Sequence, residues 1–412
     1  MNNTLSFPGT FSKSPLAWGL PENTHILTAH GSTLTLNDGK EYLDWVSGLG
    51  SNLLGYGSYN REYILKLSDA ISLYGGSLSL PHRLEHEVAE QLSSILSKRI
   101  PYWNTNPVSI RFMKTGSDAT TSAIRLARAI TAKPIVICAK GGYHGWHSWT
   151  IGRTQPAHGI TRNEIQDVIE FQFGDIEDLE NVAYNKDIAG VILEQGLESP
   201  PYNFYNNLRK FCDNRKCLFI LDEIVTGLRY AIGGVSELYS IQPDLICLGK
   251  ALGNGLPISV LAGKSDYLNW FSRSDPVFCS STFWGETIGL AAAQSVLEQW
   301  GEDEVNYLWT IGNRLMNGLT KTGWNVIGDA PRSLLKFSSP EEQAFFIHGM
   351  MDEGILMNRP NFPTMAHDVA DVDRTVEASG RVREKYKVAL ERGVLEEMVK
   401  EKLPRVLFSG RR

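Results

Sequence analysis

Cysteine is scarce in this chain, and so are the features that mark several specialised classes of protein. The five cysteines among 412 residues are scattered and form no Cys-x-x-Cys pair. This pattern argues against a structural zinc site and a dithiol redox motif. An odd, scattered set is typical of the reducing cytoplasm, so we expect a cytoplasmic location. Apolar runs all fall short of the roughly 18 residues of a membrane span, so we expect no membrane association.

Positive charge is also in short supply. Lysine and arginine total 40 against 46 aspartate and glutamate residues, which gives a formal net charge of −6 and no indication of nucleic-acid binding. The first residues lack the basic segment and apolar core of a signal peptide. The composition that remains, 42% hydrophobic and 21% charged, is ordinary for a globular protein whose core needs no disulfides.

The middle of the chain alternates short apolar segments with helical patterns. The apolar segments show little polar alternation, which is typical of strands that are covered on both faces. Helices between such strands predict an α/β fold with a doubly wound, mostly parallel sheet. The clearest helix spans 117–130 and carries an apolar stripe at helical spacing. The predicted strands are 109–113, 135–139, 190–194, 218–222, 245–248 and 259–262.

The two ends of the chain have a different pattern. Asn37-Asp38-Gly39 is a turn signal between two alternating segments and predicts a hairpin over 33–44. Residues 61–97 are helical with a break at Gly75-Gly76. The part from about 321 onward contains strand-like segments and a charged helix after Asp373, as expected of a small α+β unit.

Lys250 is the most informative single residue. It ends an apolar strand and precedes a glycine-rich turn, while Asp222-Glu223 ends another strand upstream. A lysine amine that can form a Schiff base and an acid that can pair with a pyridine nitrogen are the protein groups that pyridoxal phosphate most needs. The alternatives are a surface lysine at a strand end, and an Asp222 that caps a helix or pairs with Arg229.

Two hydroxyl-bearing turns are candidate phosphate sites. The turn at Gly116-Ser117 follows a strand and opens a helix, so it offers backbone N–H groups, a hydroxyl and the positive end of the helix dipole. The alternative is that Ser117 caps its own helix. Thr282 lies in a second such loop, where a plain N-cap is again the alternative.

An aromatic and histidine-rich turn follows the strand at 135–139. Ligands bind at the carboxyl ends of strands in open α/β sheets, and Tyr143 could stack there on a planar ring. His144 and His147 are three residues apart, which does not match the His-Glu-x-x-His pattern of metal sites. We therefore expect no metal, and interpret both histidines as structural or as packing against a cofactor.

These elements, in this order and spacing, resemble the class III, pyridoxal-phosphate-dependent aminotransferases of fold type I, and within them the glutamate-1-semialdehyde aminomutase-like branch. The resemblance covers about residues 30–380 and implies a mostly parallel seven-stranded sheet in a large domain, 61–300. A smaller α+β domain would combine 1–60 with 301–412. The matching stretches are Gly39-Lys-Glu-Tyr-Leu-Asp-Trp45, Thr115-Gly-Ser-Asp-Ala-Thr-Thr-Ser-Ala-Ile-Arg-Leu-Ala-Arg128, Gly142-Tyr-His-Gly145, Leu221-Asp-Glu-Ile-Val-Thr-Gly-Leu-Arg229, Pro243-Asp-Leu-Ile-Cys-Leu-Gly-Lys-Ala251 and Ala366-His-Asp-Val-Ala-Asp-Val-Asp-Arg-Thr375.

The resemblance implies roles for the residues around the cofactor ring. Lys250 would form the Schiff base with pyridoxal phosphate and then move a proton between carbon atoms. Asp222 would pair with the pyridine nitrogen. Ile224 would pack on one ring face and Tyr143 on the other, with His144 beside them.

The resemblance also implies how the phosphate and the substrate are held. Gly116 and Ser117 would bind the phosphate of the cofactor in their own subunit. Thr282 would reach the cofactor phosphate of the neighbouring subunit, so the expected assembly is a homodimer with shared active sites. Glu194 matches an acidic position near the cofactor or the substrate.

Several departures from the family pattern fall where the substrate is expected. The aminomutase branch carries Asn-Ser-Pro-Val-Arg near its start, and that arginine holds the substrate carboxylate. This chain has Lys13-Ser-Pro-Leu-Ala-Trp18 instead, and no side chain there replaces a bidentate guanidinium. Trp18, Glu194 and Arg359 are the substrate-side candidates. Arg359 is the candidate to replace the missing anion clamp, and the alternative for Arg359 is a solvated loop residue. Further departures are Lys114-Thr-Gly-Ser117, Glu194-Gln195 and Ser281-Thr-Phe-Trp-Gly-Glu286.

These departures predict an aminotransferase that moves an amino group from an amino donor to a carbonyl acceptor by ping-pong half-reactions. Relatives with the same variants look like enzymes of carbohydrate or secondary-metabolite pathways, and we expect a substrate of that kind. The first alternative is an intramolecular aminomutase with the same machinery. The second is a catalytically silent scaffold, against which the presence of Lys250, Asp222 and Tyr143 speaks.

Overall fold

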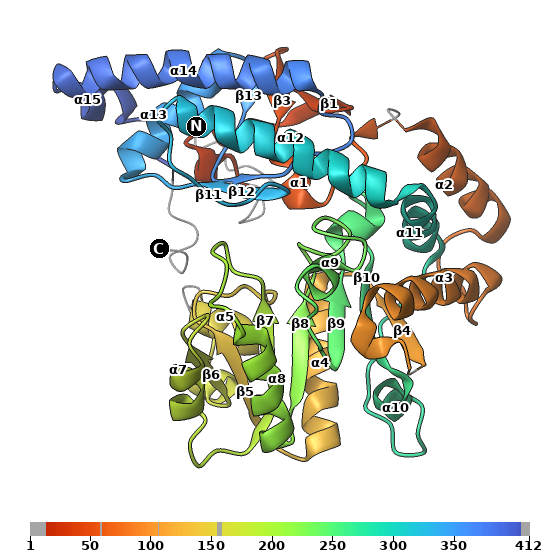
Figure 1. Cartoon of the computed structure of the whole chain (residues 1–412). Helices are drawn as coiled ribbons and strands as arrows, with labels where there is room; N and C mark the ends of the chain where they lie inside the picture. Colours follow the sequence, from red (N-terminus) through yellow and green to blue (C-terminus); the bar gives the residue numbers. More distant parts are fainter. Residues whose placement is uncertain (1–13, 58–59, 106, 155–158, 405–412) are drawn as a thin grey trace. The chain divides into compact units, whose positions relative to one another are not determined.

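The chain folds into two compact units in the computed structural model, which describes residues 14–57, 60–105, 107–154 and 159–404. One unit combines the described chain up to Asn60 with the chain from Asn306 onward, and the other runs from Arg61 to Val305. Figure 1 shows both units and labels most of their helices and strands. None of the described helices is long and apolar enough to cross a membrane.

The unit from Arg61 to Val305 is built on a seven-stranded sheet, which confirms the predicted α/β fold. All neighbouring strands are parallel except the pairs made by β10, which runs antiparallel to β4 and β9. In spatial order the strands are β4 (Val108–Met113), β10 (Ser259–Lys264), β9 (Leu245–Leu248), β8 (Leu218–Asp222), β7 (Ile188–Glu194), β5 (Ile135–Ala139) and β6 (Val168–Phe171).

Helices flank this sheet (Figure 1). The predicted helix 117–130 is α4 (Gly116–Thr131), which packs along β7, β9 and β10. Its buried face includes Ala119, Ala123 and Ala127, and such small side chains let the helix backbone approach the sheet closely. The other helices of this unit are α2 (Arg61–Tyr74), α3 (Arg83–Arg99), α5 (Ser148–Thr154), α6 (Arg162–Ile165), α7 (Ile176–Val182), α8 (Phe204–Arg215), α9 (Gly234–Leu238), α10 (Ser265–Leu268) and α11 (Thr287–Gln299), with short 3₁₀ turns at Pro101–Trp103, Lys250–Gly253 and Asn269–Phe271.

The other unit contains two small sheets. The predicted hairpin is present as β2 (Thr33–Leu36) and β3 (Glu41–Asp44). These strands lie in a four-stranded sheet with β1 (Ile26–His30) and β13 (Ile355–Leu356). The second sheet contains β11 (Val326–Asp329), β12 (Arg332–Leu335) and β14 (Pro360–Asn361). Helix α12 (Glu302–Lys321) belongs to this unit from Asn306 onward. The other helical elements are a 3₁₀ turn at Pro15–Trp18, α1 (Ser47–Gly50), α13 (Pro340–Asp352), α14 (Val369–Glu391) and α15 (Leu395–Val399).

Two of the sequence stretches that carry the family resemblance meet inside this unit. The rings of Trp45 and His367 stack with centroids 4.0 Å apart. The Trp45 indole N–H donates to Thr375 Oγ1 at 2.8 Å, and His367 Nε2 lies 3.1 Å from the Asp44 carbonyl. All of these side chains are buried. The two stretches therefore form part of the core of this unit.

Candidate active site

The carboxyl ends of four parallel strands bring most of the candidate residues to one edge of the sheet. Glu194 ends β7 and Asp222 ends β8, and the two are register partners. Asp222 is in turn the register partner of Cys247 in β9, whose chain continues to Lys250. Tyr143 and His144 follow β5, the neighbour of β7 on its other side. This edge is where ligands bind in open α/β sheets.

Asp222 is buried and makes its main contact with His144. The Asp222 Oδ2 atom lies 2.8 Å from His144 Nδ1, and Oδ1 accepts a hydrogen bond from the Ile224 backbone N–H at 3.1 Å. The two side chains are only 4% and 2% exposed. A buried carboxylate needs such donors, because burial without them is costly. His144 therefore fixes the orientation of the carboxylate, and the ion pair of Asp222 is with His144 and not, as in the alternative interpretation, with Arg229.

Ile224 lies where three turns converge. A Cβ atom on Gly116 would come within 3.1 Å of the Ile224 side chain, and a Cβ atom on Gly249 within 3.0 Å. The turn that opens α4, the turn after β8 and the residue before Lys250 are thus in direct contact. Lys250 itself has φ of +41°, in the left-handed region that is uncommon for residues other than glycine. Unusual backbone conformations of this kind cluster at functional sites.

The turn after β5 packs onto the start of α4. Gly145 has φ of +111°, and a Cβ atom there would lie 2.5 Å from Ser117 Oγ. The Ser117 hydroxyl accepts a hydrogen bond from the Trp146 backbone N–H at 3.1 Å, and the Thr120 hydroxyl donates to the His144 carbonyl at 2.6 Å. Together with the Asp222–His144 contact, these bonds connect the α4 turn to the end of β8.

The alternative role of Ser117 as a helix cap is wrong. The N-cap of α4 is Thr115, which forms a reciprocal capping box with Asp118. Thr115 Oγ1 accepts from the Asp118 N–H at 3.2 Å, and Asp118 Oδ2 accepts from the Thr115 N–H at 2.9 Å. The first N–H groups of a helix have no partner within the helix. The N–H groups of Gly116 and Ser117 therefore remain suited to an anion such as a phosphate ester.

Glu194 and Thr282 lie at the margin of this group of residues. Glu194 is half-buried, and its Oε1 atom is 3.5 Å from the Tyr143 backbone N. Thr282 is exposed, and its carbonyl accepts a hydrogen bond from the Ser77 hydroxyl at 2.8 Å. Thr282 is not the cap of the helix that follows, because the Glu286 carboxylate occupies that position.

Two of the three substrate-side candidates, Trp18 and Arg359, belong to the other compact unit. Trp18 packs against the buried cluster that contains Leu34 and Tyr42, which gives it a structural role. Arg359 is half-buried, and its carbonyl accepts from the Leu335 N–H at 2.7 Å. Lys13 lies outside the described residues.

Sequence reasoning named Glu223 without giving it a role. This carboxylate is fully buried and accepts from the Val235 N–H at 3.0 Å, from the Ser236 N–H at 2.8 Å and from the Ser236 hydroxyl at 2.6 Å, and also from the Thr226 hydroxyl. Burial raises its pKa above the ordinary range, and the hydrogen bonds oppose that rise. Glu223, which directly follows β8, thus binds the first turn of α9. Its position next to Asp222 was the available sequence signal.

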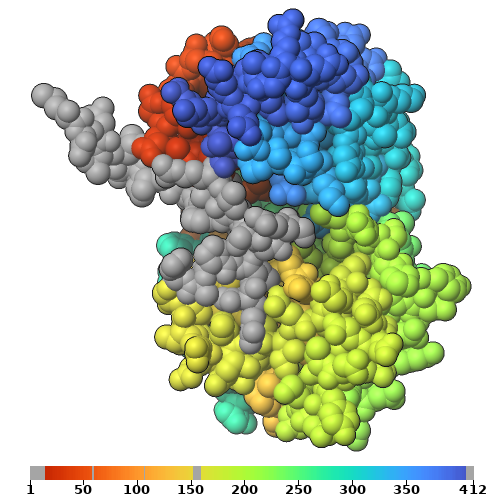
Figure 2. All heavy atoms as spheres, turned by 90° about the vertical axis from the view of Figure 1, so that its left-hand side faces the viewer, coloured from red at the N-terminus to blue at the C-terminus, as the bar shows by residue number. Residues whose placement is uncertain are grey.

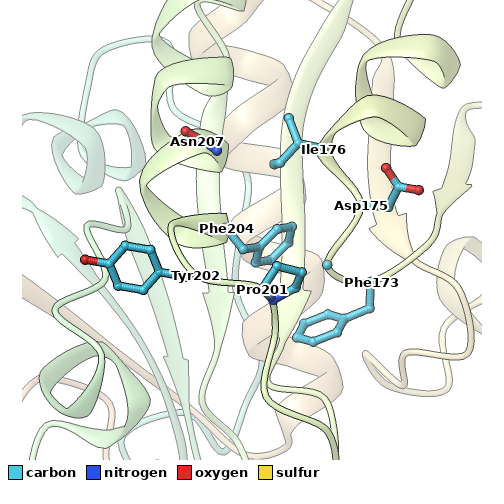
Figure 3. Close-up of a pocket in the computed structure, with 8 residues that line it drawn as sticks. Phe173, Asp175, Ile176, Pro201, Tyr202, Phe204 and Asn207 are labelled. Atoms are coloured by element: carbon cyan, nitrogen blue, oxygen red, sulfur yellow. The ribbon is translucent and has the colours of Figure 1, made fainter.

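A separate pocket of about 490 Å³ lies beyond the ends of β6 and β7 (Figure 3). Phe173, Pro201, Tyr202 and Phe204 surround it, as the close-up shows. The yellow to yellow-green chain segments that contain α7 and α8 form part of the molecular surface in Figure 2. None of the candidate residues lines this pocket, so the candidate site is defined by the strand ends and not by this cavity.

The comparisons with known proteins agree with this geometry. The family model described as Aminotransferase class-III matches residues 20–357. Glutamate-1-semialdehyde 2,1-aminomutase of Desulforamulus reducens is 28% identical over 394 residues, which cover 86% of this chain and 89% of that one. The protein of the same name from Saccharolobus islandicus is 32% identical over 313 residues, covering 72% and 70% of the two chains.

Solved structures agree as well. The FumI protein of Sphingopyxis sp. MTA144, in its PLP internal aldimine form, is 26% identical with a TM-score of 0.82, and the alignment covers 93% of this chain and 94% of that one. An omega-transaminase from Sphaerobacter thermophilus is 20% identical with a TM-score of 0.80, covers 89% and 92% of the two chains, and supports the fold alone. The family match spans well over half of the sequence, and the chain therefore belongs to the class III aminotransferases, a family of pyridoxal-phosphate-dependent enzymes.

Proposed function

We propose that this enzyme transfers an amino group from an amino donor to a carbonyl acceptor in two half-reactions at Lys250. The observation that carries the proposal is the convergence at one sheet edge of the Lys250 turn, the buried Asp222–His144 pair and the N–H groups that open α4, which have no partner within the helix. The donor and the acceptor are small molecules, and the departures noted above favour a carbohydrate or secondary-metabolite substrate.

The residues fit pyridoxal phosphate. A Cβ atom on Gly116 or on Gly249 would crowd Ile224, so the absence of a side chain lets both turns pack against Ile224, which is proposed to lie on one face of the ring. When bound, the cofactor supplies an electron sink for negative charge at the substrate carbon. We assign the phosphate to the N–H groups of Gly116 and Ser117, and the pyridine nitrogen to Asp222.

The remaining roles concern the ring faces and the proton. Ile224 and Tyr143 would pack on opposite faces of the ring, and His144 keeps the Asp222 carboxylate oriented through the 2.8 Å contact. The Lys250 amine would hold the cofactor through its aldehyde group, and as a free amine it would accept a proton from one carbon and return it to another. Glu194 and Arg359 are proposed to face the substrate.

An intramolecular aminomutase is the second candidate, and the curated relatives favour it over transfer between two molecules, because they carry that name. The sequence at 13–18 favours transfer between two molecules, because it lacks the arginine of the aminomutase branch. The two candidates share the same cofactor site and differ only in whether the aminated product leaves before the amine is returned.

A half-reaction experiment separates the two candidates. The purified enzyme is treated with candidate amino donors, the released keto product is removed by gel filtration, and the absorbance of the cofactor is followed as carbonyl acceptors are added. A transferase accumulates the stable pyridoxamine form and regains the starting spectrum only with an acceptor. If no donor and acceptor pair exchanges amine, while an amino-aldehyde substrate is isomerised, the mutase is correct.

We also propose a cytoplasmic homodimer in which Thr282 reaches the cofactor phosphate of the partner. The five cysteines are all free and buried, which fits a reducing compartment. The Thr282 loop contacts Ser77, and large apolar side chains around these two segments are exposed. Leu73, Leu80 and Phe283 are 73%, 78% and 59% exposed, and such a surface is typical of an interface. Sedimentation velocity measures the assembly directly.

Replacing Gly145 with alanine is expected to weaken cofactor binding at least about 10-fold, because the new methyl group would collide with Ser117 at the start of α4. Gly159→Ala is the matched control, since Gly159 also has positive φ, +82°, but has open space around it. Equilibrium titration of the apo protein with pyridoxal phosphate is the measurement. Equal affinities in the two variants would contradict the assigned phosphate site.

A further inference from the structure

Lys114 and Glu286, two of the departures from the family pattern, form an ion pair with each other. The Lys114 Nζ atom contacts Glu286 Oε1 and donates to the Pro257 carbonyl at 3.0 Å. The side chains are 16% and 12% exposed. Water and salt screen an ion pair less when it is buried, and removal of one partner then leaves an uncompensated charge. The pair is therefore a strong constraint on the segments that it joins.

Glu286 is also the N-cap residue of α11. Its carboxylate caps α11, with Oε2 accepting from the Ile288 N–H at 2.8 Å and Oε1 accepting from the Gly289 N–H at 2.6 Å. A Cβ atom on Gly289 would lie 3.0 Å from the Pro257 carbonyl and 3.2 Å from Lys114 Nζ. The absence of a side chain at Gly289 lets the ammonium, the carboxylate and the carbonyl meet.

Each group in this cluster belongs to a different segment of the proposed site. Lys114 directly precedes Thr115, the cap of α4, and so begins the turn that is proposed to hold the phosphate. Pro257 belongs to the loop that continues from Lys250 and leads into β10. Glu286 ends the loop that contains Thr282. A single ammonium group thus ties all three segments together.

We propose that the Lys114–Glu286 pair is a positioning device that sets how tightly the phosphate end of the cofactor is held. The inference rests on the proposed function, in which Gly116 and Ser117 bind the phosphate. Neither side chain is assigned a contact with the substrate. The pair fixes the position of the phosphate turn relative to the Lys250 loop. Its loss therefore raises the dissociation constant of the cofactor, while the rate of the chemical step at saturating cofactor stays nearly unchanged.

The first test replaces Lys114 with methionine, which keeps the length of the side chain and removes its charge. We expect the dissociation constant of pyridoxal phosphate for the apo protein to rise at least about 10-fold, because Glu286 is left without its cation. The rate of the donor half-reaction at saturating cofactor should change less than about 3-fold. Tryptophan fluorescence during cofactor titration measures the affinity without reference to activity.

The second test separates the cap of α11 from the ion pair. Glu286→Asp keeps a good N-cap residue, but the shorter side chain withdraws the carboxylate from Lys114. We expect this variant to lose cofactor affinity like Lys114→Met while the apo protein keeps its melting temperature. The double variant Lys114→Met/Glu286→Asp should have the same cofactor affinity as whichever single variant binds less tightly. The two effects do not add, because both substitutions remove the same ion pair.

Lys66→Met is the matched control, since Lys66 pairs with Glu298 on the same helix α11 but both side chains are more exposed, at 29% and 38%. Its cofactor affinity should equal that of the wild type. The proposal is overturned if Lys114→Met binds the cofactor as tightly as Lys66→Met, or if its half-reaction at saturation slows as much as its affinity falls. Failure of the wild type to exchange amine would instead refute the proposed function and leave the affinity comparison intact.

Discussion

Replacing Lys250 with alanine is expected to lower the rate of each half-reaction by about 10⁴-fold or more, because the residue is proposed to act both as nucleophile and as the group that moves the proton. The measurement is single-turnover absorbance of the bound cofactor after mixing with an amino donor. The variant should also lose the visible band that marks the lysine-bound cofactor, while the free energy of unfolding of the apo protein stays near that of the wild type.

Lys264→Ala is the control for this experiment. Lys264 also ends a strand, β10, but its ammonium lies over the Tyr102 ring at 4.1 Å. This variant should keep both the spectrum and the half-reaction rate. A Lys250→Ala enzyme that still turned over at more than about 1% of the wild-type rate would require another catalytic base, and the proposed role of Lys250 would be wrong.

Replacing Asp222 with asparagine should lower the half-reaction rate by about 10²- to 10³-fold, the usual loss when one preorganised charge is removed from an active site. Asparagine keeps the shape of the side chain and an oxygen that can accept from the Ile224 N–H, so the fold should persist. What is lost is the negative charge that the pyridine nitrogen is proposed to face. The rate and the absorbance maximum of the bound cofactor are the two readouts.

Asp213→Asn supplies the comparison, because Asp213 pairs with Arg209 in the same unit and is 61% exposed. That variant should keep the rate and spectrum of the wild type. An Asp222→Asn enzyme with an unchanged spectrum and rate would show that the carboxylate does not face the ring. A lowered melting temperature with an unchanged spectrum would assign Asp222 a structural role through His144.

Apolar patterns in the sequence were enough to predict the strands that carry the site. The six predicted strands of the seven-stranded sheet are all present, because strands covered on both faces leave an apolar run that few other structures produce. The missing strand, β6, is short and lies at the edge of the sheet, and Glu170 interrupts its apolar pattern. The sequence provided no comparable signal for it.

The local chemistry of the turns was harder to predict. The sequence at 115–118 offers two hydroxyl groups as possible caps of α4, and only the structure shows that Thr115 takes this role while Ser117 accepts from Trp146. The choice depends on the turn after β5, which is distant in sequence. For the same reason, the sequence shows Lys114 and Glu286 only as separate departures and not as partners, because they are 172 positions apart.

The antiparallel strand β10 has a consequence for the order of events during folding. It lies between β9 and β4, so the Lys250 strand and the phosphate-turn strand are joined only through it. β4 and β10 are about 150 residues apart in sequence, and pairings of such long range form slowly. A cofactor held by these turns, as proposed, would bind only after β4, β10 and β9 have paired, and it would therefore stabilise the native state alone.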